Sequence, residues 1–173
     1  TQDIIESLNT NKIDTKLFFF IAQNQNSIQH IPVKLDDMDD ASLYSGSYTL
    51  LNKCLDINVK SEIIVIITDN ITTGRDACTT KFYEMLNNGS IYDLIDVLPK
   101  KISFTGLNYS NNQYYKGEKG LLCYFIHQNI DSTSGSQLEY KRVINSIGKN
   151  QNNEILHIKP INGEHFNISE KDD

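Results

Sequence analysis

The segment from Ser61 to Thr80 carries the residues whose types and spacing come closest to a recognisable chemistry. It reads SEIIVIITDNITTGRDACTT, so five consecutive β-formers at 63–67 precede an Asp-Asn pair and a Thr-Thr-Gly turn. Such a turn can surround a sugar phosphate with N–H groups and hydroxyls where a helix begins. It can also be an ordinary strand-to-helix corner. The uninterrupted apolar run predicts a strand buried on both faces.

This segment resembles the ribose-phosphate element of the type I phosphoribosyltransferases, where an apolar strand ends in two adjacent acids, an apolar residue and Thr-Thr-Gly. The resemblance implies a ribose and phosphate site built from Asp69, Thr72, Thr73 and Gly74. Asn70 stands where the second acid is expected, and Asp76 puts a negative charge where the family has a phosphate-binding Thr. A phosphoribosyltransferase-like or sugar-phosphate-binding protein is therefore the alternative function, not the preferred one.

A second candidate site is the acidic cluster Asp36, Asp37, Asp39 and Asp40. Carboxylate oxygens suit hard cations, but the spacing lacks the alternating acids and distal Glu of a calcium loop. Acidic residues are also favoured where a helix begins, because they complement its dipole. We therefore predict that the cluster precedes a helix at about residues 39–55, and we predict neither a metal site nor a cofactor.

Thiols, imidazoles and hydroxyls show no catalytic or metal-binding spacing. Cys54, Cys78 and Cys123 contain no close pair, which predicts reduced, mostly buried thiols in a reducing compartment. The four His residues form neither HxxxH nor HExxH, so each is predicted to be a strand or loop residue and not a ligand. The Gly-x-Ser-x-Gly motif is absent, and no other motif organises Ser, His and Asp, so no catalytic triad is predicted.

Composition places the chain among folded proteins. Its 173 residues, 39% hydrophobic and 22% charged, predict one domain. The net charge of −6 argues against sequence-specific nucleic-acid binding and gives no support to membrane contact, although Lys100-Lys101 and Lys141-Arg142 are local basic pairs. Neither a signal peptide nor a membrane-spanning apolar run is recognisable, so we expect an intracellular location.

The apolar periodicity predicts the following elements: a helix within 1–13, a hairpin of strands 16–23 and 28–35, a helix at 39–55, a strand at 62–68, helices at 75–86 and 91–98, strands at 101–107 and 120–128, a helix at 137–147 ended by Gly148, and a strand at 154–158. Pro32 lacks an N–H, which places the second strand at an edge or a bulge.

This order predicts an α+β fold, because strands and helices do not alternate regularly. We expect a single domain with a mostly antiparallel mixed sheet and helices packed on it. Its parts would be an N-terminal arm at 1–15, a globular domain at 16–162 and a polar tail at 163–173. The most apolar strand positions predict these core residues: Phe18, Phe20, Ile63, Val65, Ile67, Leu122, Phe125 and Ile155.

The same order is similar to the globular domain of rhabdovirus matrix proteins. The similar stretches are KLFFFIAQ near the start, and KKISFTGL followed by YYKGEKGLLCYFIHQ and a helix. The resemblance implies a non-enzymatic viral structural protein, present in host cytoplasm and virion, that self-associates and binds the viral nucleoprotein. It would link the nucleocapsid to the envelope during assembly. A small adaptor or effector domain is a third interpretation.

The N-terminal arm carries the residues predicted for self-association: Ile4, Ile5, Leu8 and Ile13. Apolar residues in an otherwise polar arm are rarely left in water without a partner. The arm therefore folds back on its own domain or docks on a neighbouring copy. The matrix resemblance favours the neighbouring copy.

Overall fold

A computed structural model describes residues 2–10, 16–24, 27–34, 36–37, 50–55, 62–68, 76–89, 91–108, 113–129, 134–151, 154–159 and 167–169. These ranges contain α1 (Gln2–Thr10), β1 (Leu17–Asn24), β2 (Ser27–Val33), the 3-10 turn η3 (Leu51–Lys53), β3 (Ile63–Thr68), α2 (Asp76–Leu86), β4 (Tyr92–Asn108), β5 (Gln113–Gln128), α3 (Ser134–Gln151), β6 (Leu156–Lys159) and β7 (Asn167–Ser169). Helices and antiparallel sheets in one domain confirm the predicted α+β class.

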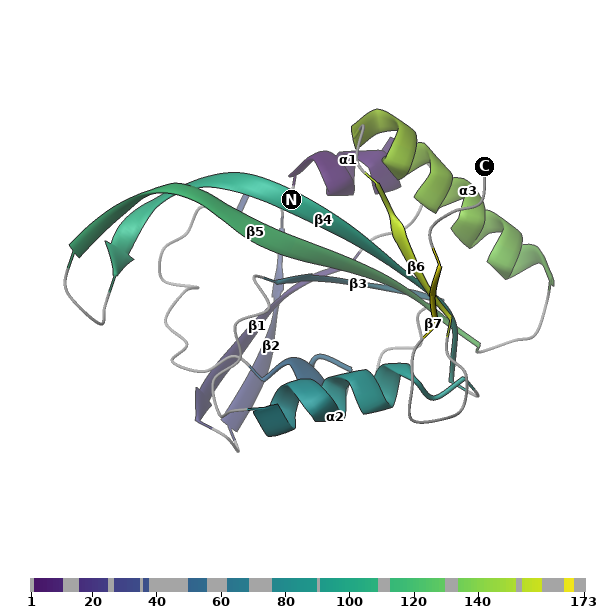
Figure 1. Cartoon of the computed structure of the whole chain (residues 1–173), viewed down its shortest axis with the longest axis horizontal. Coiled ribbons are helices and arrows are strands. Elements are labelled where there is room, and N and C mark those ends of the chain that lie inside the picture. Colours follow the sequence, from purple (N-terminus) through teal and green to yellow (C-terminus); the bar gives the residue numbers. More distant parts are fainter. Residues whose placement is uncertain are drawn as a thin grey trace.

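The main sheet has the strand order β3-β5-β4-β6-β7, and the long hairpin of β4 and β5 forms its centre. In Figure 1 helix α2 lies on one side of this sheet, and α1 and α3 lie on the other. The α2-side cluster consists of Leu51, Leu55, Ile66, Phe82, Leu86, Tyr92, Ile95, Val97, Tyr124 and Ile126. The α3-side cluster consists of Ile4, Leu8, Leu98, Cys123, Phe125, Tyr140, Val143, Ile144 and Ile147.

Strands β1 and β2 form a separate two-stranded antiparallel sheet. This confirms the predicted hairpin, and both of its strands are edge strands. Pro32, opposite Phe18, is therefore tolerated, as the sequence indicated. Helix α2 and strands β3 and β6 also match their predicted positions within one or two residues.

The short helix predicted at 91–98 is wrong, because residues 92–98 belong to β4. Leu94 and Leu98 pack toward the α3 side, whereas Ile95 and Val97 pack toward the α2 side. A strand covered on both faces carries apolar side chains on both, and this pattern imitates the spacing of a helix. Pairing with β5 along its whole length decides the outcome.

The predicted core is confirmed in part, because Phe125 belongs to the α3-side cluster and five more of the eight residues pack against one of the two clusters. Among its eight residues only Phe125 is buried, and Phe18 is 36% exposed. Six side chains are partly buried: Phe20, Ile63, Val65, Ile67, Leu122 and Ile155. Strand β3 contributes side chains to both clusters, so both of its faces contact the core, although it is an edge strand of the main sheet. Most of the buried apolar side chains come from α2, α3 and the end of the β4–β5 hairpin that lies far from its turn.

The N-terminal segment folds back on its own domain. Ile4, Ile5 and Leu8 are 1%, 5% and 4% exposed, and two of them belong to the α3-side cluster. These three side chains are therefore covered by their own chain, which corrects their expected exposure to a neighbouring copy. Ile13 lies outside the described residues.

Helix α3 continues through Gly148 to Gln151, so this glycine does not end the helix as predicted. A Cβ at position 148 would lie 2.8 Å from Cδ1 of Ile155, so the glycine permits close packing just before β6. Strand β7 lies within the predicted polar tail and pairs with β6. Most of the helix predicted at 39–55 lies outside the described residues. In the part that is described, no helix is long and apolar enough to cross a membrane.

Candidate functional site

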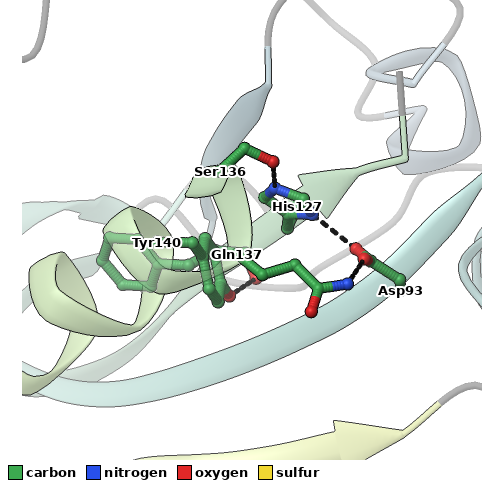
Figure 2. A network of polar contacts seen from close by, with 6 residues as sticks. Asp93, His127, Ser136, Gln137 and Tyr140 are labelled. Atoms are coloured by element: carbon green, nitrogen blue, oxygen red, sulfur yellow. Dashed lines mark hydrogen bonds and ion pairs between the residues drawn. The ribbon is translucent and has the colours of Figure 1, made fainter. Parts of the chain in front are cut away.

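A polar network lies where β4 begins, β5 ends and α3 begins. Its centre is His127, the penultimate residue of β5, which is 1% exposed. A buried imidazole needs hydrogen-bond partners on its ring nitrogens, because desolvation is costly. Figure 2 shows Asp93 and Ser136 on opposite sides of this ring.

Asp93 reaches His127 because β4 is irregular at this point. Tyr92 pairs with Gln128 and Leu94 pairs with His127, so Asp93 is an extra residue in β4. Tyr92 packs in the α2-side cluster, while Leu94 packs against the α3-side cluster. A bulge changes the direction of side chains locally, and here it brings Asp93 beside the imidazole.

Ser136 and Gln137 come from the first turn of α3. The Oγ of Ser136 lies 3.0 Å from Nε2 of His127, and Nδ1 of the same ring lies 2.5 Å from Oδ1 of Asp93. The Nε2 amide of Gln137 donates to Oδ2 of Asp93 over 2.5 Å. Both carboxylate oxygens of Asp93 are therefore engaged, which fixes the orientation of this side chain.

The carboxylate also sets the role of each imidazole nitrogen. An ionised carboxylate only accepts hydrogen bonds, so Nδ1 of His127 carries the proton that it donates to Asp93. In the neutral imidazole, Nε2 is then an acceptor, and the hydroxyl of Ser136 donates to it. This is the order of contacts by which a histidine acts as a base toward a serine hydroxyl.

Tyr140 supports the ring from α3. Its ring meets that of His127 edge to face at a centroid distance of 5.4 Å, and its hydroxyl donates to the backbone carbonyl of Phe125 over 2.8 Å. Burial raises the pKa of Tyr140 well above its ordinary value, so the phenol stays protonated. The imidazole is thus held between an aromatic edge and two polar partners.

A second acid–imidazole pair lies one strand further along the sheet. Asp96 of β4 stands opposite His157 of β6, and Nδ1 of His157 contacts Oδ1 of Asp96. Burial raises the pKa of Asp96, while hydrogen bonding with Tyr140 and the nearby His157 oppose the shift. Tyr140 is therefore close to both acid–imidazole pairs, because its ring packs against His127 and its side chain acts on the pKa of Asp96.

The residues that the sequence singled out lie elsewhere. The proposed phosphate-binding residues Asp69, Thr72, Thr73 and Gly74 lie outside the described residues. Asp36 and Asp37 are exposed after β2, and Oδ2 of Asp37 accepts the N–H of Lys34 over 2.7 Å. Asp39 and Asp40 are not described. Over the described ranges, no group of three or more His, Cys, Asp and Glu is arranged to hold a metal ion.

Neither of the two described thiols, Cys54 and Cys123, forms a disulfide. Cys123 is buried, and Cys54 is partly buried. Burial raises the pKa of the Cys54 thiol to about 12, so it is protonated at neutral pH. The side chain of Cys78 is not described. His30, His127 and His157 lie in strands, as predicted, and His165 is not described.

Sequence reasoning missed this network for a physical reason. Asp93 and His127 are 34 positions apart, and Ser136 follows nine residues later, so no fixed spacing links them. The one local signal is a polar residue within each of two otherwise apolar runs, IYDLI and YFIHQ.

No known family, curated protein or solved structure matches this chain.

Proposed function

We propose that the chain is a small hydrolase in which Ser136 attacks an ester carbonyl with His127 as its base. The observation that carries this proposal is the continuous contact from Ser136 Oγ to His127 Nε2 and from His127 Nδ1 to Asp93, at 3.0 and 2.5 Å. A serine hydroxyl is a weak nucleophile by itself, and an adjacent oriented base activates it. Asp93 acts on Ser136 through the imidazole of His127, and Gln137 acts through the carboxylate of Asp93. Both are therefore positioning residues.

In the first step Ser136 Oγ forms a bond to the carbonyl carbon, and its proton passes to Nε2 of His127. The carbonyl electron pair moves onto oxygen. When that pair returns, the bond to the alcohol breaks and the alcohol takes the proton from Nε2. A water molecule then attacks the acyl-serine by the same route, which releases a carboxylic acid and restores Ser136. One ester and one water give one acid and one alcohol.

Access to the network favours Ser136 as its reactive member. The imidazole is fully covered, whereas Ser136 is partly exposed and its neighbour Gln137 is exposed. The first four N–H groups of a helix lack carbonyl partners within the helix. Ser136 lies in this turn of α3, and the proposal assigns N–H groups of the turn to the negative oxygen that forms during attack.

A fluorophosphonate probe tests the proposal, because it labels activated serines covalently. We expect peptide mass spectrometry to find the label on Ser136, together with hydrolysis of p-nitrophenyl acetate. Ser136→Ala should abolish both, and Ser146→Ala in the same helix is the matched control that should keep both. A positioned general base contributes about 10²–10⁴-fold to the rate of a reaction. We therefore expect His127→Gln to slow ester hydrolysis by about this factor.

A purely structural network gives a different result. If the contacts serve only to attach α3 to the sheet, Ser136→Ala lowers the melting temperature, but the wild-type protein shows neither label at position 136 nor ester hydrolysis above the Ser136→Ala background. That result would refute the hydrolase proposal.

The matrix-like structural role is a second proposal. A two-stranded extension of β4 and β5 projects from the main sheet, and such a projection favours a function in docking (Figure 1). Self-association, nucleoprotein binding and a link between nucleocapsid and envelope come from the sequence resemblance alone. No described contact bears on the sugar-phosphate alternative, whose residues lie outside the described ranges.

A further inference from the structure

A row of three side chains crosses the α3 side of the main sheet. Phe125 of β5 and His157 of β6 both stand opposite Asp96 of β4, one on each side of it. Side chains directly opposite each other in an antiparallel pair lie on the same face of the sheet, and Phe125 packs in the α3-side cluster. Asp96 and His157 therefore face α3 as well. This row lies beside the polar network, because His127 follows Phe125 by two residues on β5.

Tyr140 of α3 contacts both this row and the network. Its hydroxyl donates to the backbone carbonyl of Phe125 over 2.8 Å, and it is also within hydrogen-bond reach of the Asp96 side chain. Its ring meets that of His127 edge to face, with 5.4 Å between the centroids (Figure 2). Tyr140 is 1% exposed, so water does not compete for these contacts. One buried phenol thus joins Asp96 to the imidazole of the candidate site.

The phenol has one proton to donate, and two acceptors compete for it. When Asp96 is neutral, its own O–H can donate to the phenol oxygen, and the phenol proton is left for the carbonyl of Phe125. When Asp96 is ionised, its carboxylate is the stronger acceptor, because a hydrogen bond to a charged group is shorter and stronger than a neutral one. The phenol proton then turns from Phe125 to Asp96.

The charge of Asp96 depends on pH. Burial raises the pKa of its carboxyl group, so Asp96 ionises at a higher pH than an ordinary aspartate. The titratable groups that face it are Tyr140 and Lys141 from α3 and His157 from β6, and all three oppose this shift. The side chain of His157 is 34% exposed, against 6% for Asp96, so His157 is the member of the pair in contact with solvent.

We propose that Tyr140 is a positioning residue for His127 and that the protonation state of Asp96 regulates it. With neutral Asp96, the phenol is bound to Phe125, and its ring holds the imidazole in the network. With ionised Asp96, the phenol turns away from Phe125 and this support weakens. The effect on catalysis rests on the proposed hydrolase function, whereas the link from Asp96 to His127 does not.

An NMR titration of the full chain tests the link. The carboxyl carbon of Asp96 reports its ionisation, and the ring signals of Tyr140 and His127 report the response. We expect both ring signals of the wild type to show a step at the midpoint of the Asp96 carboxyl, separate from any step that His127 itself produces. Asp96→Asn should lose this step. In Tyr140→Phe the His127 signal should lose it although Asp96 still titrates, because the ring remains and the hydroxyl is absent.

Glu139→Gln is the matched control, because it removes an exposed carboxylate from the helix that carries Tyr140. This variant should keep the step at the midpoint of the Asp96 carboxyl. Urea denaturation at each pH checks that every variant stays folded.

The labelling rate of Ser136 with the fluorophosphonate probe measures the consequence for catalysis. The ratio of the wild-type rate to the Tyr140→Phe rate isolates the phenol, because the charge of Asp96 and the titration of His127 are common to both proteins. We expect this ratio to fall toward one as pH rises through the titration of Asp96.

Three outcomes would overturn the proposal. Ring signals of the wild type that do not change at the midpoint of Asp96 would show that no link exists. A step at His127 that persists in Tyr140→Phe would mean that Asp96 acts through its charge alone. A labelling ratio that is independent of pH would exclude regulation of the site. Both steps without any label on Ser136 would instead refute the hydrolase proposal and support the link, so the two failures are distinguishable.

Discussion

Asp93→Asn separates the structural role of the polar network from its chemical role. The wild-type carboxylate accepts one hydrogen bond from Nδ1 of His127 and one from Gln137, both at 2.5 Å. An asparagine keeps the size of the side chain but offers only one carbonyl oxygen as acceptor. Its NH2 group must then face either His127 or Gln137.

The expected loss of stability follows from these two contacts. Hydrogen bonds to charged groups contribute about 1.5–3 kcal/mol, and neutral ones contribute about 0.5–1.5 kcal/mol. The side chain of Asp93 is 17% exposed, so water replaces part of what is lost. Gln137 is exposed and can rotate its amide to match the new partner. We therefore expect Asp93→Asn to lower the free energy of unfolding by about 1–3 kcal/mol.

The expected chemical loss is larger. Without the negative charge, the imidazolium formed when His127 accepts the proton of Ser136 is no longer stabilised. We expect fluorophosphonate labelling of Ser136 to slow by about 10²–10⁴-fold, while urea denaturation shows that the variant stays folded. Gln137→Ala is the matched control, because it removes one bond to Asp93 and leaves the charge. A folded Asp93→Asn variant that is labelled at the wild-type rate would refute the reasoning.

Three further predictions concern burial. Phe125→Ala should lower the free energy of unfolding by about 3–5 kcal/mol, and Val65→Ala at the partly exposed edge strand should cost clearly less; equal losses in urea denaturation would contradict the burial pattern. Burial raises the pKa of Asp96, so its contribution to stability is complete below the unfolded pKa of about 3.9 and is lost as pH rises through the native pKa. The free energy of unfolding of Asp96→Asn, relative to that of wild type, should therefore increase with pH between the unfolded and native pKa values of Asp96 and then level off. A difference in the free energy of unfolding that urea denaturation finds to be independent of pH would contradict this expectation. The Cys54 thiol, with its pKa raised to about 12, should react with iodoacetamide far more slowly in the native protein than in urea, and equal rates by mass spectrometry would contradict its burial.

The sequence by itself determined the α+β class and the position of most elements. The hairpin of β1 and β2 follows from two apolar runs separated by a short polar turn, and α1, α2 and α3 follow from their apolar spacing. These signals are local, because periodicity and turn residues act over a few neighbouring positions. Pro32 indicated an edge strand for the same reason, since the missing N–H belongs to that residue alone.

Only the tertiary structure decided which surfaces are buried and which side chains meet. Residues 92–98 form a strand because β5 pairs with them and because α2 and α3 cover both faces, and neither fact is local. The edge position of β3 likewise depends on strand order. The network at His127 needs a bulge at Asp93, the end of β5 and the first turn of α3 in one place. Each of these residues is ordinary in its own segment, and long-range pairing alone brings their polar atoms within hydrogen-bond distance.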